Sequence, residues 1–211
     1  MKEVEFNEGE VEMFQISNGQ PSKEYSGGGY KSNNNYQKKF KPFKPPEESV
    51  KVLYTDGGSK KFSGNENGYH WVGAWCFYDQ DTDQLMGSVV DNATNNQMEL
   101  TSAIEALKYL DKMGISKDKW VTIKLDSDYV RLGIIFWIKK WMKSDWKRTN
   151  REGQLEDVKN KELWQELYEL SAARKVFWVH VPGHSGEEGN EKADKHCSQL
   201  IREFVESHDI H

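Results

Sequence analysis

The sequence has little of what secreted or membrane proteins need. Only two of its 211 residues are cysteines, Cys76 and Cys197. Two cysteines are too few for a disulfide framework, so we expect both to be small core residues in a reducing compartment. No stretch approaches the roughly 20 apolar residues of a membrane span. The first residues lead into an acidic segment, unlike a secretory signal. We therefore expect a cytoplasmic protein.

The chain also lacks a net positive charge. Its formal charge is −5, so the molecule as a whole is not a basic nucleic-acid coat. Any attraction to nucleic acid must come from a local patch. Residues 139–151 are such a patch, because they hold six Lys or Arg side chains against one acid.

Aliphatic residues are scarce from residue 1 to residue 48. The segment 23–44 is rich in Gly, Ser and Asn and carries six lysines, one glutamate and scattered aromatic residues. Such a composition cannot bury enough apolar surface to fold, so we predict a disordered basic and aromatic arm. It is either an arm that holds nucleic acid by charge and stacking, or a plain linker. We expect the folded domain at residues 49–206 and a short tail at 207–211.

Hydrophobic periodicity predicts the elements of this domain. Strands are expected at residues 50–55, 70–78, 85–90, 120–125 and 175–181, and helices at residues 97–112, 129–142, 162–172 and 190–205. Three consecutive strands followed by alternating helices and strands predict an α/β fold, with a mixed sheet flanked by helices.

Two aspartates directly follow predicted strands. Asp56 precedes Gly57 and Gly58 after the first strand, and Asp126 follows the fourth. Ligands of open α/β sheets gather at these strand ends, so the two carboxylates are expected to lie close together. Their repulsion would require a cation, and an all-oxygen site suits Mg²⁺ or Mn²⁺. Alone, Asp56 could instead be a turn residue and Asp126 a helix cap.

Two further acids stand early in predicted helices, near the apolar side. Glu99 borders the apolar stripe of its helix, and Asp194 shares a side with Cys197. A carboxylate on a nearly buried face is costly unless it is paired or binds a metal. Each also has an ordinary alternative. Asn96 and Glu99 have the spacing of a capping box, and Asp194 could stabilise the helix dipole.

Several strings of residues occur together in a recognisable order. They are residues 55–58 (TDGG), 94–100 (TNNQMEL), 126–130 (DSDYV) and 183–194 (GHSGEEGNEKAD), with supporting matches at 133–138, 161–164, Trp141 and Trp146. From about residue 50 to about residue 204, the chain resembles ribonuclease H type 1. The resemblance implies a ribonuclease H-like fold with a five-stranded mixed sheet, three strands antiparallel and then parallel strands, flanked by helices.

The resemblance also implies an activity and its catalytic residues. The activity is endonucleolytic cleavage of the RNA strand of an RNA–DNA hybrid, which leaves 5′-phosphate ends. Asp56 would bridge two Mg²⁺ ions, for which Mn²⁺ may substitute, Asp194 would help hold the ion on the nucleophilic water, and Glu99 and Asp126 would hold the other ion. His184 would assist proton transfer or product release.

A substrate-binding surface follows from the same resemblance. Its residues are Asn65, Thr94, Asn95, Asn96, Gln97, Trp137, Lys140, Trp141, Lys143, Trp146 and Lys147. The three consecutive amides match positions near the 2′-hydroxyls of the hybrid's minor groove. The basic residues belong to a protrusion that would neutralise phosphates of the DNA strand. From the residues alone, this patch could also be a solvated helix end with core tryptophans.

Some positions depart from the family's pattern. The first motif has a second glycine, Gly58, where serine is usual, and the loop at residues 60–68 is longer and lacks a Pro-Gly run. Asn65 is therefore only a loose match to that loop's substrate-binding residue. Asn92 and Lys140 stand where other members place an Arg and an Asn of a phosphate pocket. The arm does not resemble the small hybrid-binding domain of some members.

Other readings of the sequence predict different behaviour. A zinc site of His180, His184, His196 and Cys197 is disfavoured, because its spacing fits no common zinc motif. A same-fold nuclease acting on another duplex, a catalytically inert hybrid-binding module and a partner-binding protein driven by the arm remain as alternatives. We expect a monomer with no obligate protein partner.

Overall fold

The computed structural model describes residues 12–14, 49–63, 69–183 and 185–210. Apart from residues 12–14, the predicted N-terminal arm lies outside the described residues. Asn65 and His184 lie outside them as well.

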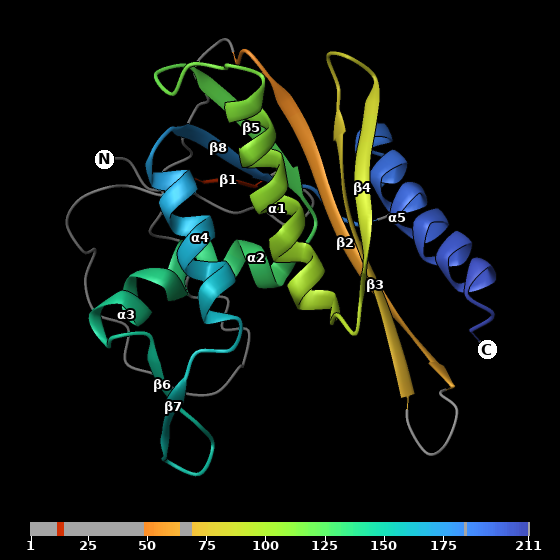
Figure 1. Cartoon of the computed structure of the whole chain (residues 1–211). Coiled ribbons are helices and arrows are strands. Elements are labelled where there is room, and N and C mark those ends of the chain that lie inside the picture. The colour runs from red at the N-terminus through yellow and green to blue at the C-terminus, as the bar shows by residue number, and fades with distance from the viewer. Residues whose placement is uncertain (1–11, 15–48, 64–68, 184, 211) are drawn as a thin grey trace.

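A six-stranded mixed sheet forms the centre of the fold (Figure 1). Its order is β1 (Glu12–Phe14), β8 (Lys175–His180), β5 (Trp120–Leu125), β2 (Val52–Ser63), β3 (Tyr69–Asp79) and β4 (Gln84–Asp91). The β2–β3 and β3–β4 pairs are antiparallel, whereas β2–β5 and β5–β8 are parallel. This confirms the predicted five-stranded sheet. A short edge strand, β1, pairs antiparallel with β8 and was not anticipated.

Helices cover both faces of the sheet (Figure 1). The helices α1 (Asn95–Lys112) and α4 (Lys161–Ala172) pack on one face, and their apolar side chains share a large core with β2, β5 and β8. The helix α5 (Glu188–Ser207) packs on the other face, over β2 and β3. The apolar side chains of α1 and α5 are thus packed on the sheet, whereas in α4 Trp164 and Leu167 are buried and the predicted Leu163 and Leu170 are only partly buried.

The helix predicted at residues 129–142 is interrupted. The chain forms α2 (Asp128–Leu132), a π-helical turn (Gly133–Trp137) and α3 (Ile138–Lys143). A Cβ at Gly133 would lie 1.9 Å from the Trp164 ring, so only glycine allows this turn to pack against α4. A small hairpin follows, with β6 (Lys147–Thr149) and β7 (Leu155–Asp157). Sequence periodicity missed it because its strands have three residues each.

The structure corrects the expectation for the two cysteines. Both are buried, as expected, but Cys76 of β3 and Cys197 of α5 form a disulfide with a Cα–Cα distance of 5.8 Å. The bridge ties α5 to the sheet.

A buried ion pair holds the far end of the first two long strands. The Lys51 Nζ donates to both carboxylate oxygens of Asp79, at 3.0 and 2.8 Å, and Tyr109 donates to the same carboxylate at 2.9 Å. Both charged residues are less than a tenth exposed. Burial alone would raise the pKa of Asp79, but hydrogen bonds from Lys51 and Tyr109 lower it below its ordinary value.

We expect Asp79→Asn to lower the free energy of unfolding by about 3 kcal/mol at neutral pH, because it leaves Lys51 charged and buried. Since a lowered carboxyl pKa stabilises the fold only while the group is ionised, the difference from wild type should shrink as pH falls below about 4. Urea unfolding at several pH values measures this. Asp81→Asn, at an exposed partner 3.4 Å from Lys51, is the control. A pH-independent difference would contradict the electrostatic origin.

Candidate active site

The four acids singled out in the sequence lie around one pocket of about 230 Å³. Carboxylate oxygens of Asp56, Glu99 and Asp126 all lie within 4.8 Å of one another, and Asp194 lines the same pocket. The acids come from β2, α1, the end of β5 and α5. The structure therefore brings together residues that are far apart in the sequence.

Asp56 does not lie in a turn. β2 continues through it to Ser63, so the predicted strand end at this residue is wrong. The parallel pairing of β2 with β5, however, stops at Thr55 opposite Leu125. Asp56 thus lies just past the end of the parallel pairing, beside Asp126, as expected of strand-end ligands. It is only 9% exposed.

Close approach of α1 to β2 explains the glycine after Asp56. A Cβ at Gly57 would lie 2.2 Å from the backbone nitrogen of Glu99 and 2.2 Å from the backbone carbon of Met98. No larger residue fits without moving the start of α1. Gly57 thus allows Glu99 to reach Asp56.

Neighbouring residues supply the N-cap of α1, so Glu99 is not needed there. Thr94 is the N-cap, and its hydroxyl accepts a hydrogen bond from the Gln97 N–H. The Gln97 side chain accepts from the Thr94 N–H at 2.8 Å, which completes the capping box. The alternative of a box between Asn96 and Glu99 is therefore wrong. Glu99 lies one residue beyond the first turn, with its carboxylate toward Asp56 and Asp126.

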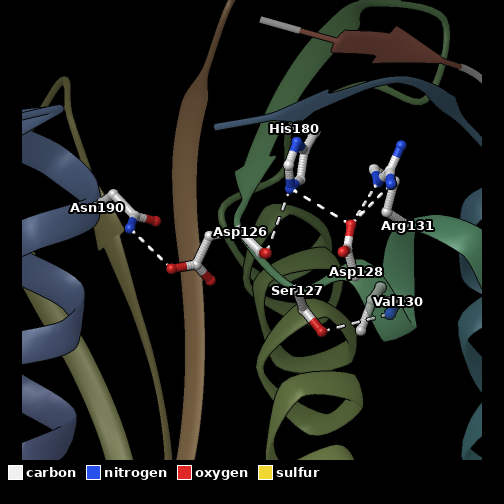
Figure 2. A network of polar contacts seen from close by, with 7 residues as sticks. All are labelled: Asp126, Ser127, Asp128, Val130, Arg131, His180 and Asn190. Carbon is white, nitrogen blue, oxygen red and sulfur yellow. Dashed lines mark hydrogen bonds and ion pairs between the residues drawn. The ribbon is translucent and has the colours of Figure 1, made fainter. Parts of the chain in front are cut away.

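Asp126 is not the N-cap of α2, and hydrogen-bond partners from β8 and α5 position it (Figure 2). Ser127 is the N-cap of α2 and accepts from the Val130 N–H. The Asn190 side chain, from α5, donates to the Asp126 carboxylate at 3.0 Å. The His180 ring nitrogen lies 3.3 Å from the Asp126 backbone oxygen. Both the main chain and the carboxylate of Asp126 are thus positioned.

Asp194 lies beyond the first turn of α5, which begins at Glu188. Glu188 and Glu191 are the acids of that first turn, so stabilisation of the helix dipole does not require Asp194. The buried Ala193 and Cys197 fix this side of α5 on the sheet, which directs Asp194 toward the pocket.

Crowding of carboxylates makes the pocket strongly anionic. Burial, together with the charges of Asp126 and Asp194, raises the pKa of Asp56 to about 7. Burial and the charges of Asp56 and Asp126 raise the pKa of Glu99 well above its ordinary value. Lys60 lines the same pocket, but burial and neighbouring acids are the main causes of both shifts. A hard divalent cation with oxygen ligands suits this donor set.

The predicted amide residues lie at the N-terminal end of α1, beside the pocket. Asn95 accepts from the Ser59 N–H at 3.2 Å and donates to Glu99 at 3.4 Å. Gln97 is engaged in the capping box with Thr94. Asn96 is exposed, and no hydrogen bond joins its side chain to a described residue. Of the three amides, that of Asn96 is therefore the one that is not hydrogen-bonded to a described residue.

The predicted basic protrusion consists of α3 and the β6–β7 hairpin, which we call the handle (residues 138–157). Trp141 lies 5.7 Å from Trp137, 6.4 Å from Trp146 and 5.5 Å from Trp164, between ring centroids. The three predicted tryptophans thus form a cluster that joins the handle to the core.

Acids of β7 neutralise part of the handle's charge. Lys147 pairs with Asp157 at 2.8 Å, and Arg148 pairs with Glu156. Lys140 and Lys143 are exposed and form no ion pair with a described residue. Arg151, between β6 and β7, is also exposed and forms no ion pair with a described residue, so Lys140, Lys143 and Arg151 are the handle's accessible cations.

Comparison with known proteins agrees with this geometry. The sequence profile described as RNase H matches residues 48–202. The chain belongs to the RNase H family. It is 41% identical over 143 residues to a ribonuclease H from Ruthia magnifica subsp. Calyptogena magnifica, which covers 68% of this chain and 89% of that protein. It is 40% identical over 155 residues to a ribonuclease H from Rickettsia bellii, covering 74% and 91%. The predicted family and enzyme class are confirmed.

Solved structures share the fold at lower identity. A foamy viral protease–reverse transcriptase in complex with double-stranded DNA aligns with a TM-score of 0.57 and 22% identity, covering 73% of this chain and 95% of that chain. A type 1 RNase H with the type 2 active-site motif aligns with a TM-score of 0.53 and 22% identity, covering 74% of each chain. Among the described helices of this RNase H, none is long and apolar enough to cross a membrane.

Sequence reasoning missed the two residues that position Asp126. Asn190 is 3% exposed, and its Oδ1 has no hydrogen-bond partner among the described residues. Asn190 stands four residues before Asp194 within a matched string, which could have drawn attention to it. His180 carried no such signal, because it lies on a strand.

We expect Asp56→Asn to stabilise the metal-free protein by about 2 kcal/mol at pH 7.5, because it removes a charge that burial and the charges of Asp126 and Asp194 disfavour. A raised carboxyl pKa means that folded Asp56 keeps a proton that the unfolded chain loses between pH 4 and 7. Wild-type stability should therefore fall as pH rises through that range, and the variant's should fall less. Denaturant unfolding in chelator measures both, and equal slopes would contradict the assignment.

We expect Asn190→Ala to lower kcat about tenfold and to change KM little, because it frees the Asp126 carboxylate without touching the handle or α1. The control is Gln199→Ala, which removes an exposed side chain from the same helix. Steady-state kinetics on an RNA–DNA hybrid provides the measurement. A raised KM with unchanged kcat would instead indicate that Asn190 contacts substrate.

Proposed function

We propose that this RNase H is an endonuclease that hydrolyses the RNA strand of RNA–DNA hybrids and depends on Mg²⁺, for which Mn²⁺ substitutes. The proposal rests on one observation above all, the convergence of Asp56, Glu99 and Asp126 within 4.8 Å, with Asp194 on the same pocket. Four converging acids suit a reaction in which the protein positions and neutralises charge.

The donor set fits divalent metal ions. Asp56, Glu99, Asp126 and Asp194 offer oxygen ligands only, and burial together with neighbouring carboxylates raises the pKa of Asp56 and of Glu99. When bound, two such ions activate water and stabilise the leaving oxygen at phosphorus. The chain's own part is to hold the carboxylates together, through the Gly57 contact, the capping box at Thr94 and the hydrogen bond from Asn190.

Recognition of RNA over DNA is assigned to the start of α1. Asn95 and Asn96 stand beside the acidic pocket, and amides can both donate to and accept from a 2′-hydroxyl. Asn95 also bridges Ser59 and Glu99, so contact at this amide would be linked directly to a catalytic acid. Gln97 and Thr94 support this site through the helix cap.

Binding of the DNA strand is assigned to the handle. Lys140, Lys143 and Arg151 supply its accessible charge, whereas Lys147 is paired with Asp157. Trp137, Trp141 and Trp146 hold the handle on the core through their ring contacts, so they act on binding mainly through support. Counter-ion release by the lysines would add affinity that falls with salt.

Parts of the proposal rest on sequence alone. His184 is assigned to proton transfer or product release, Asn65 to substrate contact and residues 1–48 to a basic arm, all outside the described residues except 12–14. A cytoplasmic location and a monomeric state complete the proposal, and fractionation and sedimentation test them.

We expect the wild-type chain to cleave a labelled RNA–DNA hybrid with Mg²⁺ or Mn²⁺, and not with chelator, and to leave matched DNA and RNA duplexes intact. Asp126→Asn should still bind the hybrid but lose at least about a hundredfold in kcat, because it removes a ligand charge and almost no volume. The measurements are product mapping on gels and hybrid binding by fluorescence anisotropy.

Each other outcome has a definite meaning. Cleavage of another duplex in preference to the hybrid would favour a different nuclease of this fold. Binding without metal-dependent cleavage would make the domain an inert binding module. Turnover by Asp126→Asn at the wild-type rate would refute the metal site.

A further inference from the structure

β2 and β3 continue well past the catalytic pocket as a two-stranded ribbon. Their pairing extends from Gly58 opposite Ala74 to Ser63 opposite Tyr69. β4 ends at Asp91, opposite Val72, so the outer part of the ribbon has no third strand. Figure 1 shows this ribbon and the β6–β7 hairpin projecting at the same end of the molecule, on the two sides of the N-terminal end of α1.

One face of the ribbon continues the face on which α1 packs. Gly57 and Gly73 both lie against α1, since a Cβ at either would overlap Met98. Side chains alternate along a strand, so Lys61 shares this face with Gly57, and Trp71 shares it with Gly73. Lys61 and Trp71 are also direct cross-strand partners. They therefore stand on the same face as Asn95 and Asn96, farther out along the ribbon.

Trp71 is unusually accessible for a tryptophan of this chain. It is 40% exposed, whereas Trp164 and Trp178 are fully buried and Trp141 and Trp146 pack on the core. The Lys61 ammonium lies 6.0 Å from the centre of the Trp71 ring. The Trp71 carbonyl accepts from the Asn92 N–H at 2.7 Å, which fixes the ribbon to the turn before α1. An exposed ring beside an exposed lysine forms a surface suited to sugar and phosphate.

We propose that Lys61 and Trp71 form a second binding surface for the nucleic-acid duplex, on the opposite side of the catalytic pocket from the handle. Lys61 neutralises a backbone phosphate, and the Trp71 ring packs on the adjoining sugar. This rests on the proposed function, because it takes the duplex to be the substrate held at the acids.

The reach of the ribbon predicts where the contact falls. Lys61 is five residues beyond Asp56 on β2, a distance of roughly 17 Å along an extended strand. At 3.4 Å per base pair this is about five base pairs from the metal site. The contact therefore exists only when the duplex continues at least that far on the ribbon side.

A length series tests the proposal. The substrates carry one short RNA segment within a DNA duplex, with the flanking duplex extended separately on each side from about two to about ten base pairs. We expect Trp71→Ala to raise KM about fivefold and to leave kcat unchanged. The effect should appear only on substrates whose flanking duplex is long on the side that faces the ribbon. Lys61→Ala should lower the salt slope of log Kd by about 0.9 on the same substrates and leave the short ones unaffected.

Two variants serve as matched controls. Leu85→Ala removes a side chain that is as exposed as Trp71 but lies near the start of β4, far from the ribbon. Lys119→Ala removes an exposed lysine just before β5. Neither should show the length dependence. Wild-type behaviour of Trp71→Ala and Lys61→Ala on the long flanks, or an equal loss at every length, would overturn the proposal. Failure of the wild-type chain to cleave any RNA segment would instead refute the proposed function.

Discussion

Repulsion among four buried or half-buried carboxylates is the constraint on which the rest of the site depends. The carboxylate oxygens of Asp56, Glu99 and Asp126 lie within 4.8 Å of one another, away from bulk water. Burial and the repulsion between these like charges therefore raise the pKa of Asp56 and of Glu99. The surrounding fold has to resist this force. The sheet supplies two acids from adjacent parallel strands, and helices on its two faces each bring one more. A site opened by repulsion on any one side would lose its affinity for a divalent cation.

The resisting contacts come from residues that do no chemistry. Thr94 and Gln97 cap α1, Ser127 caps α2, and Asn190 holds the Asp126 carboxylate. Because Thr94, Gln97 and Ser127 cap the two helices, the carboxylates of Glu99 and Asp126 are not needed as caps. Asn190 also extends from α5, so the helix that carries Asp194 is linked directly to the loop that carries Asp126. Gly57 contributes by having no side chain, because α1 would otherwise stand too far from β2.

Much of the fold could be predicted because its periodicity is regular. β5 has the predicted bounds, and the amphipathic pattern of α1, α4 and α5 led to the correct helices. Prediction was weaker where a contact distant in sequence decides the local structure. Pairing with β3 extends β2 through Asp56 to Ser63. Packing of Trp164 against Gly133 accompanies the π-helical turn that interrupts the helix predicted at residues 129–142. For the candidate site, the sequence predicted that the four acids would lie together, as they do, but the residues that hold them needed three-dimensional distances.

The distribution of charge explains how a chain of net charge −5 can meet a polyanion. The acids of the pocket are buried or half-buried, and the proposed divalent cations would neutralise them. Of the exposed lysines, Lys60 lines the pocket, whereas Lys140 and Lys143 lie on the handle and Lys61 lies on the ribbon. In the handle, Asp157 and Glu156 pair with two basic residues, so the patch is less positive than its sequence implies. A weakened handle would give the proposed second contact on the other side of the pocket more weight, because a duplex held at two separated points could not pivot about the proposed metal site.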